Sequence, residues 1–243
     1  MKSVMDEALI IGLMDYRESD RIVTFFTRDH GRLSGIARGA KRSVKRFGGV
    51  LELFSRLTLS FTPADGLVTI NDVDPVTIFP SIRATLDRIA HAGYACELVA
   101  AMAPERQANQ RLFRLLSAYL EHLDAAPARH SDRHFFEINF LNIIGYRPPL
   151  ESCCRCGMPL GPEGGSWSGG PEGGVSCPRC GRSGSRLGGE AIAALQRSLA
   201  TGRFGQVSFP PGELAEAEAY LEAFISANVQ RPLKSRAFLR LSP

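Results

Sequence analysis

The chain has 243 residues, of which 44% are hydrophobic and 22% charged, and its formal net charge is +4. This composition is that of a folded, soluble protein. No apolar run approaches the ~18 residues that a membrane span requires, and the first residues lack the pattern of a signal peptide. We therefore expect a cytoplasmic protein whose six cysteines are reduced and not joined in disulfides.

The first 80 residues have the pattern of short β-strands separated by turns. Residues 56–62, for example, alternate between apolar side chains and polar ones, which is typical of a half-buried strand. Five such strands are expected, at residues 8–15, 20–27, 32–38, 56–62 and 67–73. A five-stranded meander of this size favours a small closed barrel. The OB-fold is such a barrel, and it commonly binds single strands across one face and its loops.

The segment around the third expected strand is strongly basic. Residues 28–47 contain seven basic residues and one acidic residue, a net charge of +6, so the rest of the chain sums to −2. Cations this close together repel one another, and a polyanion relieves that repulsion. We therefore interpret the segment as a nucleic-acid-binding strand and loop. The expected contacts are Arg28, Arg38, Lys41, Arg42, Lys45 and Arg46.

Two questions about this basic segment stay open. The segment either binds nucleic acid or is only a solvated loop with no ligand. Phe47 either stacks on a base or merely anchors the loop to the rest of the domain. The sequence leaves both open.

Beyond Pro80 the hydrophobic period changes from 2 to 3.6 residues, which predicts a helical bundle. Helical stripes lie within residues 82–96, 112–123, 131–144, 189–199 and 212–229. For the third helix, Ser131 or Asp132 is the expected N-cap and Gly145 the expected stop. The predicted fold class is α+β multidomain: a five-stranded OB-fold barrel at residues 1–79, then a mostly α-helical domain at residues 80–243.

Two cysteine pairs predict a metal site inside the helical domain, at about residues 150–187. Cys153 and Cys156 form one C-x₂-C pair, and Cys177 and Cys180 form another after a gap of twenty residues. Four thiolates in this pattern suit one tetrahedral Zn²⁺. A redox pair is the alternative, which two matching pairs disfavour. Because four ligands fill the coordination sphere, we expect a structural zinc ribbon, with Cys96 and Cys154 outside it.

The sequence has no pattern that favours an enzyme. It lacks a Walker loop, a nucleophile elbow and a zinc-protease helix. Asp65, Asp72 and Asp74 lie near a strand end and leave a magnesium-dependent nuclease as a minor alternative, although turns use Asp routinely. We therefore predict a protein with no catalytic residues.

Three segments resemble one protein family. Residues 15–55, DYRESDRIVTFFTRDHGRLSGIARGAKRSVKRFGGVLELFS, resemble the N-terminal domain of the bacterial DNA-repair RecO family. Residues 136–157, FEINFLNIIGYRPPLESCCRCG, and the LKS at residues 233–235 resemble later parts of the same family. These matches run in order across nearly the whole chain.

The resemblance implies a non-enzymatic recombination mediator that is cytoplasmic and associated with the nucleoid. Such proteins bind single- and double-stranded DNA and anneal complementary strands. With the partner RecR they help to load RecA onto DNA coated by single-stranded-DNA-binding protein (SSB), whose acidic tail docks on the helical domain. The four paired cysteines match the family's zinc quartet, and Arg38, Lys41, Arg42, Lys45 and Arg46 match its basic segment. An RNA-binding or transcription-associated zinc-ribbon protein is the alternative.

Overall fold

The computed structural model describes residues 2–47, 49–181 and 183–239, apart from the side chains of Val44 and Lys45. These residues form two compact units. Unit 1 comprises the residues up to Pro127 together with those from Leu233 onward, and unit 2 comprises Ala128–Pro232. Unit 2 is therefore inserted between two parts of unit 1 in the sequence.

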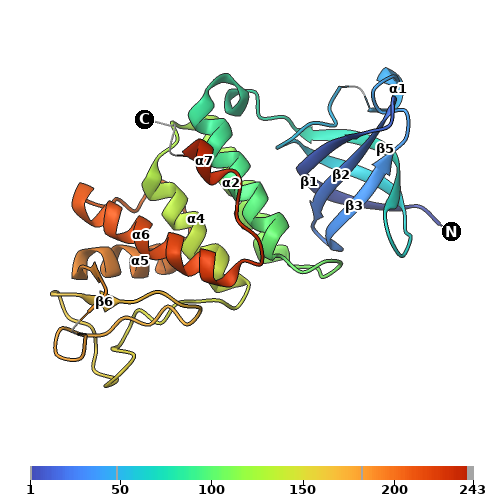
Figure 1. The fold of residues 1–243 in the computed structure, drawn as a ribbon. Coiled ribbons are helices and arrows are strands. Elements are labelled where there is room, and N and C mark those ends of the chain that lie inside the picture. Colours follow the sequence, from blue (N-terminus) through green and yellow to red (C-terminus); the bar gives the residue numbers. More distant parts are fainter. Residues whose placement is uncertain (1, 48, 182, 240–243) are drawn as a thin grey trace. The chain divides into compact units, whose positions relative to one another are not determined.

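The N-terminal part of unit 1 is the expected closed barrel of five strands (Figure 1). They are β1 (Val4–Tyr16), β2 (Asp20–Thr27), β3 (Gly31–Ala37), β4 (Arg56–Thr62) and β5 (Val68–Thr77). The expectation of a simple meander is wrong, because the strand order is β1-β2-β3-β5-β4. β5 pairs with β3 in parallel at Gly35 and Ile36, and a parallel pair requires a crossover connection. The crossover is the connection from β3 to β5, which contains the short helix α1 (Val44–Phe47) and β4.

The barrel interior is filled by alternate side chains of all five strands. Val23 and Phe25 on β2, Leu33 on β3 and Leu57 on β4 are among the residues of this buried cluster. Gly35 lies where β3 meets β5, and a Cβ there would come within 2.9 Å of a Val68 methyl group. The parallel contact that closes the barrel therefore requires a residue without a side chain at this position.

Besides α1, the described helices of unit 1 are η1 (Ser81–Ala84), α2 (Leu86–Met102), α3 (Gln110–Ala125) and α7 (Arg236–Leu239). Asn109 caps α3 by accepting a hydrogen bond from the backbone N–H of Leu112 at 3.0 Å, as N-cap residues do. The LKS segment is bound to α2, because the Glu97 carboxylate accepts from the backbone amides of Lys234 and Ser235 at 3.0 and 2.7 Å. This contact explains why the LKS segment belongs to unit 1 and not to unit 2.

Unit 2 contains α4 (His130–Ile143), α5 (Gly189–Ala200) and α6 (Pro211–Asn228), which pack on one another, and a two-stranded sheet of β6 (Gly165–Trp167) and β7 (Ser185–Leu187). The expected N-cap of α4 is wrong, because the helix starts at His130 after Arg129. Asp132 instead accepts from the Arg129 side chain at 2.9 Å and from the Gly205 amide at 2.8 Å. The expected stop is confirmed, since Gly145 has a φ of +89° that favours glycine.

Candidate metal centre and basic surface

Four cysteine sulfurs in unit 2 converge as the spacing predicts. The Sγ atoms of Cys153, Cys156, Cys177 and Cys180 all lie within 4.8 Å of one another, and those of Cys156 and Cys177 are 3.9 Å apart. Zinc–sulfur bonds of ~2.3 Å in a tetrahedron place two sulfurs ~3.8 Å apart. The cluster therefore has the donor set and the dimensions of a four-thiolate metal site.

Backbone amides already favour ionised sulfur in this cluster. The N–H of Cys177 donates to Cys153 Sγ at 3.3 Å and that of Arg155 donates to it at 3.4 Å. Such bonds, that of Cys177 foremost, lower the pKa of the Cys153 thiol to about 6. Crowding by neighbouring sulfurs, Cys156 first, raises the pKa of Cys180 to about 12. Four thiolates are therefore unfavourable together until a cation neutralises their repulsion.

Tight turns and short ladders hold the two cysteine pairs in place. Each pair forms a turn in which a backbone amide donates back to the first cysteine's carbonyl, Gly157 to Cys153 at 2.9 Å and Gly181 to Cys177 at 2.8 Å. Gly157 has a φ of +72°, which glycine adopts without strain. Cys154 contacts the Ser176 hydroxyl at 3.4 Å, so it lies outside the cluster, as expected.

The basic segment of unit 1 has more acidic neighbours than its own sequence suggests. Lys41 Nζ lies 3.0 Å from Asp15, and the Arg42 guanidinium lies 3.6 Å from Glu18. Both acids come from the β1–β2 hairpin. Arg38 is exposed, and after the larger effect of the Gly39 hydrogen bond its positive charge contributes to lowering the pKa of the Asp20 carboxyl. The segment's charge is therefore partly balanced by carboxylates distant in sequence.

The hairpin also fixes the start of the basic segment. Asp20 Oδ1 accepts from the Gly39 amide at 2.8 Å, and the Lys41 amide donates to the Ser19 carbonyl at 3.0 Å. The Gly39 hydrogen bond, as the largest cause, lowers the pKa of the Asp20 carboxyl. The β1–β2 turn and residues 38–42 consequently form one surface at one end of the barrel.

Arg46 and Phe47 have an anchoring role. The Arg46 guanidinium donates to the Asn71 carbonyl on β5 at 2.8 Å and lies 4.9 Å over the Phe47 ring. Phe47 is 1% exposed and belongs to the barrel core, so it anchors the segment and cannot stack on a base. The Lys45 side chain lies outside the described residues.

Arg28 lies apart from the other expected contacts. Arg28 directly follows β2, at the turn of the β2–β3 hairpin. Arg38 directly follows β3, at the open end of the hairpin, where Arg21 pairs with Ala37. Eight residues of extended strand separate the two ends by roughly 25 Å. The six expected DNA contacts therefore do not form one patch.

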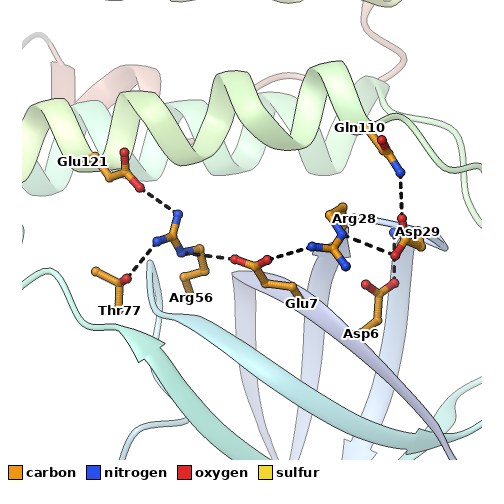
Figure 2. Close-up of polar contacts among 8 residues, drawn as sticks. All are labelled: Asp6, Glu7, Arg28, Asp29, Arg56, Thr77, Gln110 and Glu121. Carbon is orange, nitrogen blue, oxygen red and sulfur yellow. Dashed lines mark hydrogen bonds and ion pairs between the residues drawn. The ribbon is translucent and has the colours of Figure 1, made fainter.

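Arg28 takes part in a chain of ion pairs between the barrel and α3. Figure 2 shows Glu7 between Arg28 and Arg56, at 3.3 Å from each guanidinium. Arg56 also donates to Glu121 on α3 at 2.7 Å. Gln110 at the start of α3 donates to Asp29, which Arg28 contacts as well. These contacts hold the helix on the barrel, which is a structural use of Arg28.

The acids of the β1–β2 hairpin were not expected beside the basic segment. Their signal was present in the DYRESD segment at residues 15–20, which contains three acidic residues and one arginine. Only the strand register shows that this turn lies beside residues 38–42. In the described ranges, Asp65, Asp72 and Asp74 form no cluster that could share a metal ion, and no helix there is long and apolar enough to cross a membrane.

Comparisons with known proteins agree over both units. Residues 1–79 match the family model "Recombination protein O N terminal", and residues 83–237 match "Recombination protein O C terminal". Proteins named DNA repair protein RecO are similar along almost their whole length. The relative from Geobacter sulfurreducens is 49% identical over 240 residues, covering 99% of this chain and 98% of that protein. Those from Pelobacter propionicus and Symbiobacterium thermophilum are 42% and 35% identical, each covering 96% of this chain and 95% of the relative.

Proposed function

Because the chain belongs to the RecO family of DNA repair proteins, we propose that it is a non-enzymatic mediator that binds single- and double-stranded DNA and anneals complementary strands. The observation that carries this proposal is the surface formed by residues 38–42 and the β1–β2 turn. It presents Arg38 and Arg42, the latter 73% exposed, at one end of an OB-type barrel. Exposed cations on such a barrel suit a phosphate backbone.

The binding is proposed to be independent of base sequence. Phosphate contacts position a strand but carry no base information. The ion pairs of Lys41 with Asp15 and of Arg42 with Glu18 are exposed and therefore weak, so phosphates can replace the carboxylates. Annealing follows when two strands lie close together with their charges neutralised.

For the cysteine cluster we propose one structural Zn²⁺. The four sulfurs leave no open coordination position for a water molecule, which argues against a catalytic metal. The ion would join the two turns of a segment in which the described residues form one short sheet, the β6–β7 pair. Its contribution is thus to the folding of the ribbon, while the DNA contacts lie in unit 1.

We further propose the family's partners and place of action for this chain. They are RecR, the acidic tail of SSB and, indirectly, RecA, on DNA in the bacterial cytoplasm. The support is similarity along the whole chain to relatives named as DNA repair proteins. We also propose the division into an OB domain at residues 1–79 and a helical domain at residues 80–243, with the zinc ribbon within it.

Annealing of two complementary oligonucleotides coated with SSB tests this function. We expect the wild-type protein to anneal them, and a variant with Lys41, Arg42, Lys45 and Arg46 all changed to Gln to lose most of this activity. The salt dependence of its binding to single strands should also become shallower by ~0.7 in log–log slope for each lost phosphate contact.

Two controls accompany this variant. Arg46→Gln alone separates the anchoring role of Arg46 from DNA contact, and its folding is checked by circular dichroism. A second control changes four exposed arginines of the helical region to Gln, Arg111, Arg114, Arg203 and Arg231. Equal loss in the loop variant and in this control would contradict the assignment to the basic surface, and no annealing by the wild type would contradict the mediator function.

A further inference from the structure

A pocket in unit 1 lies between the barrel and α3. Its volume is about 380 Å³, which is within the range of small-molecule sites. Glu7, Arg28 and Arg56 line it from the barrel (Figure 2). The α3 residues that line it are three or four positions apart and so share one helix face: Gln110, Arg114, Ser117 and Glu121. All of these side chains are polar, so the pocket suits a charged ligand.

The two carboxylates of the pocket are already paired with cations. Glu7 lies 3.3 Å from the guanidinium of Arg28 and 3.3 Å from that of Arg56. Glu121 lies 2.7 Å from Arg56, and Arg28 also lies 3.3 Å from Asp29 outside the pocket. The lining contains three guanidinium groups and two carboxylates, which leaves one positive charge without a counter-charge in the pocket.

Arg114 is the source of this uncompensated charge. It is exposed, and in the described part of the chain no carboxylate lies within ion-pair distance of its guanidinium. Ser117, on the next turn of α3, is 6% exposed, and its hydroxyl has no hydrogen-bond partner among the described residues. A buried hydroxyl without a partner is unfavourable. The pocket therefore has one charged and one neutral donor group for which the fold supplies no acceptor.

We propose that this pocket binds a small phosphorylated anion, either inorganic pyrophosphate or the phosphates of a free nucleotide. Phosphate oxygens accept strong hydrogen bonds from guanidinium groups and from hydroxyls. Arg114 and Ser117 supply one donor group of each kind, and Arg28 supplies a second guanidinium. This inference goes beyond the proposed function, because it assigns a ligand that is not DNA.

The position of Arg114 places the anion at one end of the pocket. At 1.5 Å per residue, Arg114 lies roughly 6 Å along the helix from Gln110 and roughly 10 Å from Glu121. Gln110 marks the Arg28 end, because both residues contact Asp29. A compact anion at this end avoids Glu121, whereas a long phosphate backbone would pass beside its carboxylate. The Arg28 end of the β2–β3 hairpin is also roughly 25 Å from the Arg38 end, so the pocket is separate from the basic surface.

A bound anion would have a consequence for the stability of unit 1. It would join Arg28 on the β2–β3 turn to Arg114 on α3, in addition to the hydrogen bond from Gln110 to Asp29 at 2.8 Å. A ligand that binds the folded state and not the unfolded state stabilises the folded state by mass action. The anion should therefore raise the unfolding temperature of unit 1.

Isothermal titration calorimetry with sodium pyrophosphate tests this site, with ATP as a second probe and the ionic strength held constant. We expect the wild type to bind, Arg114→Gln to bind about tenfold more weakly and Ser117→Ala about threefold more weakly. Arg111→Gln is the matched control, because Arg111 is exposed on the same helix but does not line the pocket. Binding of pyrophosphate supports a site for the phosphate group alone, and tighter binding of ATP supports a nucleotide as its source. Pyrophosphate should raise the unfolding temperature of the wild type and of Arg111→Gln more than that of Arg114→Gln.

The outcomes separate this inference from the proposed function. No binding of either probe by the wild type, or equal affinities in Arg111→Gln and Arg114→Gln, would overturn the anion site and leave the mediator function in place. A loss of single-strand DNA affinity in Arg114→Gln that Arg111→Gln does not show would make the pocket part of the DNA surface and also overturn it. A wild-type protein that binds pyrophosphate but neither binds nor anneals DNA would overturn the proposed function alone.

Discussion

Replacing Phe47 with Ala should destabilise the barrel by about 3–5 kcal/mol. The ring is 1% exposed and packs among the apolar side chains of the barrel interior. A buried Phe removes at least ~150 Å² of apolar surface from water, worth about 4 kcal/mol at ~25 cal/mol per Å². Since the folding free energy of a domain is only about 5–15 kcal/mol, this single change should bring the barrel close to unfolding.

The loss also acts on the DNA-binding surface. α1 has four residues, too few for a helix that is stable by itself, so the buried Phe47 ring, together with the hydrogen bond from Arg46 to the Asn71 carbonyl, holds residues 44–47 on the barrel. Phe47→Leu keeps most of the apolar contact and should cost about 1.5 kcal/mol. We expect this milder variant to remain folded but to bind single strands and duplex more weakly, because residues 38–42 lose part of their support.

Urea unfolding measures the effect, with circular dichroism and hydrogen exchange of the β1–β5 amides as signals. The one tryptophan, Trp167, lies in unit 2 and does not report on the barrel. Phe238→Ala is the matched control, since that ring is 53% exposed and its loss should change the unfolding free energy by less than about 0.5 kcal/mol. Equal, small changes in the two Ala variants would refute the placement of Phe47 in the barrel core.

Three further predictions follow from named contacts. Asp15→Asn removes the carboxylate that pairs with Lys41, so it should raise DNA affinity about threefold at low salt. At high salt the affinity should be unchanged, because salt screens the interaction between exposed charges. Fluorescence titration against wild type measures this, and unchanged affinity at low salt would count against it. Cys153→Ser should lower the zinc content measured by atomic absorption and the thermal stability of unit 2, with DNA affinity retained; full zinc occupancy would contradict the four-cysteine site. The pKa of Asp20 is lowered chiefly by the Gly39 amide, so the stabilisation from the Asp20 carboxylate is complete above the ordinary pKa of 3.8 and is lost as pH falls through the lowered value. Protection of the Gly39 amide from exchange, relative to an unfolded chain at the same pH, should therefore be high at pH 5 and fall at lower pH in wild type, whereas in Asp20→Ala it should already be low at pH 5; equal protection in the two proteins at pH 5 would contradict this.

Features that depend on local periodicity or spacing could be predicted from the sequence. The alternation at residues 56–62 predicted β4 with its observed bounds, and the cysteine spacing predicted the four converging sulfurs. Contacts between distant segments could not be predicted. The insertion of β5 beside β3 depends on the Gly35–Val68 approach, which no local pattern encodes.

The basic surface shows the same limit for electrostatics. Counting charges in one window identified residues 28–47, but the partners of Lys41 and Arg42 come from the β1–β2 hairpin. Likewise, Arg28 is close to Arg38 in sequence, yet a hairpin places them at opposite ends of two strands. Charge density along a chain therefore predicts that a surface is basic more reliably than it predicts which cations are free to bind.

The insertion of unit 2 within unit 1 has a consequence for synthesis of the protein. Unit 1 includes the segment from Leu233 onward, whose amides are bound by Glu97 of α2. A ribosome must translate the 105 residues of Ala128–Pro232 before that segment exists, which takes about 5–20 s at bacterial rates. During this delay the barrel, α2 and α3 have all been made, but the final piece of their unit has not. The nascent chain therefore contains all of unit 2 before it contains all of unit 1, although unit 1 begins first in the sequence.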